Sequence, residues 1–198
     1  MLTPLTTVTR YIKAFVKAFG HTSAARCSSN SCRPDSKPSE NTEVVGQRIL
    51  TPEFKLRLFT LNCRFWTEMP ELWPFDDPYW AIYWPGGQAL SRYLLDNPAA
   101  ITARPCGAAH VVANDIDLVA AVVTHMNCGL LEPPVCLTNN MIDSPPKSFD
   151  LILPGDMFYD EALATSLRGW LDNCIDSHGT KDPIGDPGRA QFEEHRIP

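Results

Sequence analysis

The sequence predicts an α/β fold with a parallel sheet, because short apolar runs alternate with amphipathic stretches of helical length along its second half. Strands are expected at residues 110–115, 135–138 and 149–153. Helices are expected at about 117–131 and 160–174, where apolar residues recur at helical spacing. The first and last of these strands each lead within a few residues into a helix, as in the βα units of parallel sheets.

A further helix is expected from Gly86 to about Asp96, ended by Asn97-Pro98, since the residue before a proline disfavours helical backbone. Its predicted apolar face consists of Ala89, Leu90, Tyr93 and Leu94. For residues 51–58 the sequence does not decide between a helix and a strand. Thr-Pro-Glu at 51–53 is typical of a helix start, whereas the apolar residues that follow alternate as in a strand.

Residues 1–34 are predicted to be a mitochondrial transit peptide. They hold five of the 17 lysines and arginines and none of the 23 acids. Apolar side chains between Tyr11 and Phe19 fall on one helical face, and Lys13 and Lys17 lie off it, which is typical of import signals. A disordered basic tail is the alternative. The predicted organisation is therefore a leader at 1–34, a linker at 35–50 and one domain at 51–198, located in the mitochondrial matrix.

Composition argues against several classes of partner. The acids all lie beyond residue 34, so the body of the chain is strongly acidic and unsuited to nucleic acid. No run of 18 apolar residues is present, so no membrane partner is expected. The seven cysteines form no CxxC pair, and no histidine lies at zinc-ligand spacing from them. Reduced thiols are expected, and no metal site.

Residues 65–84 are rich in aromatic side chains and prolines. One interpretation is a hydrophobic lid over an edge of the core. The other is a cap over a flat or cationic ligand, because aromatic faces attract cations.

Acidic residues follow two of the predicted strands. Asp115 ends the first strand, and Asp156 and Tyr159 lie in the stretch Gly155–Asp160 after the third. Ligands of open α/β sheets bind beyond the carboxyl ends of the strands, where a carboxylate can accept hydrogen bonds from both hydroxyls of a ribose. The alternative is that these acids cap the helices that follow and that Tyr159 simply packs.

Four stretches together resemble one family. They are PYWAIYWPGGQAL at 78–90, ANDID at 113–117, GDMFYD at 155–160 and IGDPGR at 184–189. In this order, from about Asn41 to Phe192, they resemble the electron transfer flavoprotein β-subunit lysine methyltransferases. Those are S-adenosylmethionine (SAM)-dependent enzymes with a Rossmann-like seven-strand fold and a DxxY motif.

The resemblance implies a role for each matching residue. Asp115 would bind the ribose of SAM, and Asn140 would lie near its adenine. Trp84 and Gly87 would line the cofactor pocket. Asp156 and Tyr159, the DxxY pair, would orient the target lysine of the electron transfer flavoprotein β subunit.

The chain departs from this family in two places. The family's first strand, GxGxG loop and helix should lie between Pro98 and Val111, yet only residues 99–110 are there, with Cys106–Ala108 as a candidate remnant. A strand, loop and helix need roughly 20–30 residues. The family also continues beyond IGDPGR with further strands. The expected fold is therefore a seven-strand methyltransferase fold that is internally deleted and C-terminally truncated.

Four functions follow as alternatives. The first is an active protein-lysine methyltransferase. The second is a catalytically inactive remnant or splice form that binds SAM weakly or not at all and at most docks on the protein substrate. A different nucleotide binder is disfavoured because no GxGxxG is present. A small-molecule methyltransferase is disfavoured by the DxxY and aromatic-loop match.

Overall fold

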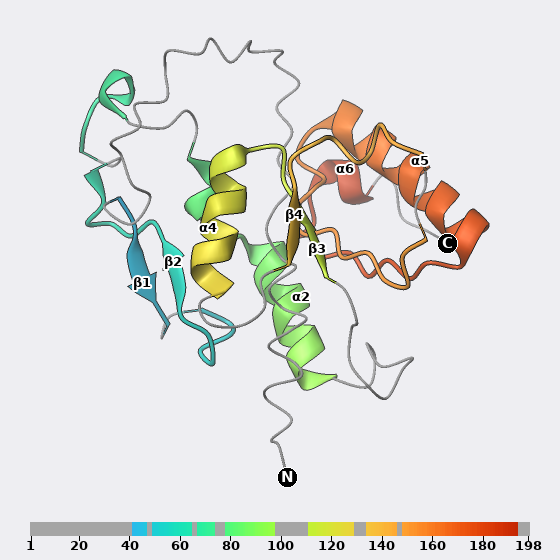
Figure 1. The fold of residues 1–198 in the computed structure, drawn as a ribbon, viewed down its shortest axis with the longest axis horizontal. Coiled ribbons are helices and arrows are strands. Elements are labelled where there is room, and N and C mark those ends of the chain that lie inside the picture. The colour runs from blue at the N-terminus through green and yellow to red at the C-terminus, as the bar shows by residue number, and fades with distance from the viewer. Residues whose placement is uncertain are drawn as a thin grey trace.

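The computed structural model describes residues 41–46, 49–64, 67–73, 78–97, 111–128, 134–145 and 148–193. The predicted transit peptide and residues 99–110 lie outside these ranges. In chain order the elements are β1 (Glu43–Val45), β2 (Leu56–Leu58), η3 (Pro70–Leu72), η4 (Tyr79–Ala81), α2 (Pro85–Asp96), β3 (Val112–Asn114), α4 (Leu118–Cys128), β4 (Val135–Leu137), α5 (Glu161–His178) and α6 (Ala190–Glu193). In the view of Figure 1, β3 and β4 lie in the middle, with α4 on one side and α5 and α6 on the other.

The strands β3 and β4 pair in parallel, with Val112 opposite Val135 and Asn114 opposite Leu137. The predicted strands at 110–115 and 135–138 are therefore confirmed in position, although each is only three residues long. Together with the helices α4 and α5, this pair makes the described chain a mixed α/β structure.

The predicted strand at 149–153 is present only as two isolated parallel bridges, Leu151 with Lys181 and Gly155 with Gly185. Backbone hydrogen bonds run from Ile152 N to Lys181 O at 2.8 Å and from Gly185 N to Pro154 O at 3.0 Å. Between them a parallel ladder needs the N–H groups of residues 154 and 183, and both residues are prolines. The two prolines thus divide what would be a continuous ladder.

The segment 178–183, which has no strand character in sequence, nevertheless contributes to this second parallel pair through Lys181. Within the described residues, no hydrogen-bonded ladder joins it to β3 and β4. Among the described residues, the observed arrangement is therefore two separate parallel pairs.

The alternation at 54–58 predicts the structure correctly, since residues 56–58 form β2 rather than a helix. It pairs antiparallel with β1, with Glu43 opposite Leu58 and Val45 opposite Leu56. β1 lies within the predicted 35–50 linker.

The predicted helix at 86–96 is confirmed as α2, but only two of the four residues of its predicted apolar face are buried. Leu90 and Leu94 are buried, whereas Tyr93 is 48% exposed and Ala89 also faces solvent. Gly86 and Ser91 are buried in their place. The reason is a backbone contact at the start of the helix, which rotates the buried face toward Gly86.

The helix α4 is also rotated relative to the sequence prediction. The helical spacing predicts one apolar stripe of Val119, Val122, Val123 and Met126, yet Val122 is 51% exposed and Met126 37% exposed. The buried residues of α4 are Ala120, Val123, Thr124 and Cys128. Small and polar side chains are buried here because Ala120 and Val123 pack against Trp80 and Ala81, which leave little space.

The helix α5 agrees with its prediction and extends four residues further. Asp160 Oδ1 accepts a hydrogen bond from Leu163 N at 2.9 Å, which caps the amino end. Gly179, with φ of 67°, ends the helix in the left-handed conformation. Trp170 and Leu171 are buried in the larger core cluster, together with Phe158 and Met157 from the segment before the helix.

In the described part of the aromatic stretch, Trp80 is packed in the core, whereas Met69, Leu72 and Tyr79 are exposed. Trp80 is 7% exposed and packs in the second cluster with Ala120 and Val123, and its ring lies 5.6 Å from that of Phe59.

Cys63, Cys128, Cys136 and Cys174 are free thiols, as expected. None of the helices in the described ranges is long and apolar enough to cross a membrane. The same residues contain no cluster of three or more potential metal ligands.

Candidate functional site

Asp115 lies where the sequence places it, directly after β3 and before α4. Its backbone N–H continues the ladder to Leu137 O at 3.1 Å, and the residue is 4% exposed. Its Oδ1 accepts a hydrogen bond from Asp117 N at 2.9 Å, and Asp117 Oδ1 accepts one from Val119 N at 2.8 Å. Asp115 therefore combines a position at a strand end with a local turn contact, and Asp117 caps α4.

Asn140 lies in the turn after β4 and is exposed. Its amide Nδ2 donates to Asp143 Oδ2 at 2.7 Å, and its Oδ1 accepts from Ile142 N at 3.2 Å. Asp115 and Asn140 thus follow neighbouring parallel strands at the same edge.

Asn114 connects the two strand ends and is not a site residue in the sequence prediction. Its Nδ2 donates to Leu137 O and to Asn139 O, both at 2.8 Å. These bonds hold the turn that carries Asn140 against the end of β3. The sequence pattern that indicates Asn114 is an amide side chain in an otherwise apolar strand, because a polar group there is stable only with a hydrogen-bond partner.

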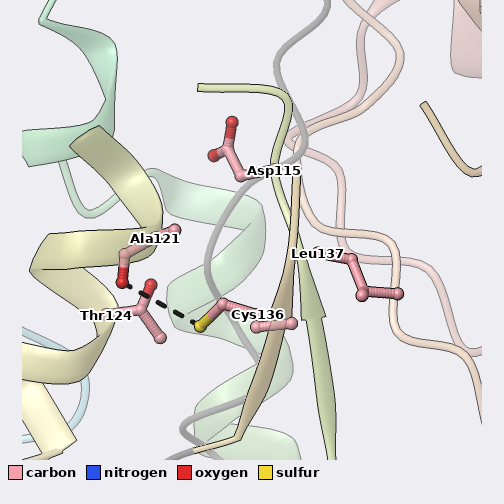
Figure 2. Close-up of a pocket in the computed structure, with 6 residues that line it drawn as sticks. Asp115, Ala121, Thr124, Cys136 and Leu137 are labelled. Atoms are coloured by element: carbon pink, nitrogen blue, oxygen red, sulfur yellow. Dashed lines mark hydrogen bonds between the residues drawn. The ribbon is translucent and has the colours of Figure 1, made fainter. Parts of the chain in front are cut away.

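A small hollow lies beside Asp115, between α4 and the two strands (Figure 2). It is a shallow, partly open depression lined by Ala113, Asp115, Ala121, Thr124, Cys136 and Leu137. Cys136 Sγ lies 3.9 Å from Ala121 O and 3.5 Å from His125 Nδ1. Burial raises the pKa of the Cys136 thiol, which disfavours the reactive thiolate.

The carboxylate of Asp156 is buried and bonded through both of its oxygens. The residue is 1% exposed, and its backbone has φ of 60°, a conformation that non-glycine residues rarely adopt. Its Oδ2 accepts from Gly87 N at 2.8 Å, at the amino end of α2, and its Oδ1 accepts from Arg189 Nη2 at 3.1 Å. Gly87 and Asp156, both predicted site residues, are therefore in direct contact.

Arg189 and Asp186 complete this cluster, and the sequence prediction does not include them. Arg189 Nη1 donates to Asp186 Oδ2 at 2.7 Å. Asp186 Oδ1 accepts from Gly188 N at 2.9 Å and from Arg189 N at 2.7 Å, and its side chain is fully buried. The sequence pattern that indicates these two residues is the GDPGR stretch, because its aspartate and arginine lie three residues apart in a turn.

At the start of α2, the backbone of Gly86 lies directly against the backbone of Gly185. A Cβ on Gly86 would lie 2.2 Å from Gly185 O and 2.7 Å from Asp156 Oδ2. Both backbone segments therefore need glycine at the point where they cross. Trp84 caps α2 without a side-chain hydrogen bond to it, and its indole Nε1 donates to Tyr79 O at 3.3 Å.

Tyr159 is half-buried, between the buried Phe158 and the helix cap Asp160. The site therefore has two parts: Asp115 and Asn140 at the end of β3 and β4, and Asp156, Gly87 and Arg189 where α2 meets the second pair. Polar groups thus gather at the carboxyl ends of parallel strands, which is the edge where open α/β sheets bind their ligands.

Comparisons with curated proteins give the family. A zebrafish (Danio rerio) electron transfer flavoprotein beta subunit lysine methyltransferase is 59% identical over 177 residues, covering 80% of this chain and 69% of the relative. The human protein of the same name is 49% identical, covering 80% and 68%. A Caenorhabditis elegans homolog is 35% identical over 184 residues, covering 76% and 75%. The chain belongs to the electron transfer flavoprotein beta subunit lysine methyltransferase family.

No family model matches the chain, and no solved structure matches it.

Proposed function

We propose that this chain transfers a methyl group from SAM to a lysine of the electron transfer flavoprotein β subunit. The identity to relatives of that name over 80% of the chain carries the proposal. The position of Asp115 supports it, because a buried carboxylate at the carboxyl end of a parallel strand is the arrangement that binds a ribose.

The residues at the ends of β3 and β4 fit a nucleoside. In the proposal, Asp115 accepts hydrogen bonds from the ribose hydroxyls and Asn140 lies by the adenine. Trp84 and Gly87 line the pocket from the amino end of α2. When bound, SAM supplies an electrophilic methyl on a sulfonium. The hollow beside Asp115 is too small to hold a nucleoside, so in this proposal its residues form only part of the cofactor site.

Asp156 and Tyr159 orient the target lysine in this proposal. A lysine with an ordinary pKa near ~10.4 arrives as an ammonium ion, and it attacks only after losing a proton. A carboxylate and a phenol can hold the ammonium and then direct the neutral amine at the methyl group. Correct placement of the reacting groups is worth about 7–11 kcal/mol.

The proposal extends to the whole fold and to location. The two parallel pairs are proposed to be halves of a Rossmann-like seven-strand sheet. Residues 1–34 are proposed to direct import into the mitochondrial matrix. A fusion of residues 1–34 to a fluorescent protein should enter mitochondria, and a cytosolic fusion would refute the import proposal.

Binding of SAM tests the cofactor site. SAM at 100 times its dissociation constant should stabilise the full chain by ~2.7 kcal/mol, a rise in melting temperature of about 5–10 °C. Asp115→Asn should abolish the rise while keeping an oxygen for the Asp117 N–H. The control Asp176→Asn, on the exposed side of α5, should retain it. A chain that melts cooperatively with no shift in SAM would refute the proposal.

A further inference from the structure

The buried carboxylate of Asp156 is paired with Arg189, a side chain that is itself partly exposed. Asp156 has a side-chain exposure of 1%, whereas Arg189 is 21% exposed and lies outside it. The inner oxygen Oδ2 is bonded to Gly87 N, and the outer oxygen Oδ1 to the guanidinium. The contact with Arg189 is to a side chain and can be exchanged for another cation, whereas the contact with Gly87 is to the backbone of α2.

Arg189 is held more closely by its other acid. Its contact to Asp186 Oδ2 is 2.7 Å, against 3.1 Å to Asp156 Oδ1. Asp186 is itself fixed by the backbone N–H groups of Gly188 and Arg189. When the guanidinium leaves Asp156, it keeps the shorter of its two ion pairs.

The remaining contacts of Asp156 do not depend on Arg189. Gly87 N still donates to Oδ2, and Asp156 N still donates to Gly185 O at 2.8 Å. The carboxylate therefore keeps its orientation while the cation at Oδ1 is exchanged. A buried carboxylate is costly without a cation, so exchange of one cation for another is favoured over simple loss.

We propose that Arg189 is the resident cation of Asp156 and that the ammonium group of the target lysine replaces it at Oδ1 when the protein substrate docks. This inference rests on the proposed function, which makes Asp156 a docking group for lysine. Arg189 is then a specificity-determining residue, because a side chain must be cationic to compete for Oδ1. A compact ammonium on a flexible stem suits this position, while the planar guanidinium stays paired with Asp186.

The direct test is a nitrogen-15 NMR titration of the full chain with n-butylammonium chloride, which reproduces the stem and ammonium of lysine. In the wild type, the Arg189 Nε–H resonance should shift on titration and the Gly87 amide should not. In Arg189→Gln, the affinity for butylammonium should rise about tenfold, because one charge-assisted hydrogen bond no longer has to be displaced. An affinity that is unchanged or lower would overturn the inference.

Two variants serve as controls. Arg92→Gln removes an arginine that also bonds two acids, Glu53 at 2.7 Å and Asp96 at 2.6 Å, on the exposed side of α2. It should leave butylammonium binding as in the wild type. Asp156→Asn should abolish the shift at Arg189 Nε–H on titration, and this comparison decides the inference even where Arg189→Gln fails to fold. A shift at Arg189 that persists in Asp156→Asn would also overturn it.

Kinetics with the electron transfer flavoprotein β subunit separate this inference from the proposed function. Arg189→Gln should lower KM for the protein substrate about tenfold, with kcat no higher than in the wild type. An unchanged or raised KM with normal methyl transfer would overturn the role of Arg189 alone. Absence of transfer in the wild type would overturn the proposed function, and the butylammonium titration would still decide the cation exchange.

Discussion

Replacing Gly86 by alanine should disrupt the junction between α2 and the second parallel pair. The new Cβ would lie 2.2 Å from Gly185 O, 2.6 Å from Gly185 C and 2.7 Å from Asp156 Oδ2, and the first two are backbone atoms that cannot rotate away. The amino end of α2 must move outward, which lengthens or breaks the bond from Gly87 N to Asp156.

The magnitude follows from three contributions. Overpacking costs about 1–3 kcal/mol, and loss of a hydrogen bond to a charged group costs about 1.5–3 kcal/mol. Alanine in a helix regains about 1 kcal/mol relative to glycine. Gly86→Ala should therefore lower the free energy of unfolding by about 1.5–5 kcal/mol, a fall in melting temperature of roughly 3–20 °C.

Gly169→Ala is the matched control. Gly169 also lies in a helix, α5, and a Cβ added there meets no atom within 4 Å. This variant should be more stable than the wild type by up to about 1 kcal/mol, because only the helix preference changes. Urea unfolding followed by circular dichroism measures both. Equal stability of Gly86→Ala and the wild type would refute the close backbone crossing.

Three further predictions concern stability. Burial, together with the charge of Asp172, raises the pKa of Asp182, so the folded state holds its proton at pH values where the unfolded chain has lost it. Stability contributed by this group falls as pH rises above ~3.9, and Asp182→Asn should raise the melting temperature at pH 7 but not at pH 3; a gain that is equal at both would contradict this. Asn114→Ala should cost about 1–3 kcal/mol by removing both bonds to the turn after β4, and an unchanged urea midpoint would show that they are not needed. Leu171→Ala should cost about 2–5 kcal/mol, since this side chain is 2% exposed in the larger core cluster; a loss under 1 kcal/mol would contradict that packing.

The sequence predicts local elements better than their partners. The helix α5 and the strands β3 and β4 follow from apolar spacing, because that signal is contained within each segment. The buried faces of α2 and α4 do not follow, since they depend on contacts with Gly185 and Trp80, which are far away in the chain. The divided ladder follows only once residues 151–155 are known to pair with residues 181–185, because this register places Pro154 and Pro183 in one ladder.

For the candidate site too, the sequence predicts local patterns but not long-range contacts. Asp115 and Asp156 are found because an acid after an apolar strand is a local pattern. The contact between Gly87 and Asp156 joins residues 69 positions apart, and no spacing rule predicts it. The sequence likewise does not predict Arg189 as a site residue, because only the folded chain shows which carboxylates surround it.

Methyl transfer tests the central claim most directly. The full chain, incubated with SAM and recombinant electron transfer flavoprotein β subunit, should add methyl groups to lysine, detected by mass spectrometry of the substrate. Asp115→Asn should reduce the methylation strongly, and Asp176→Asn should not. Folded chain that leaves every lysine of the substrate unmodified would contradict the account.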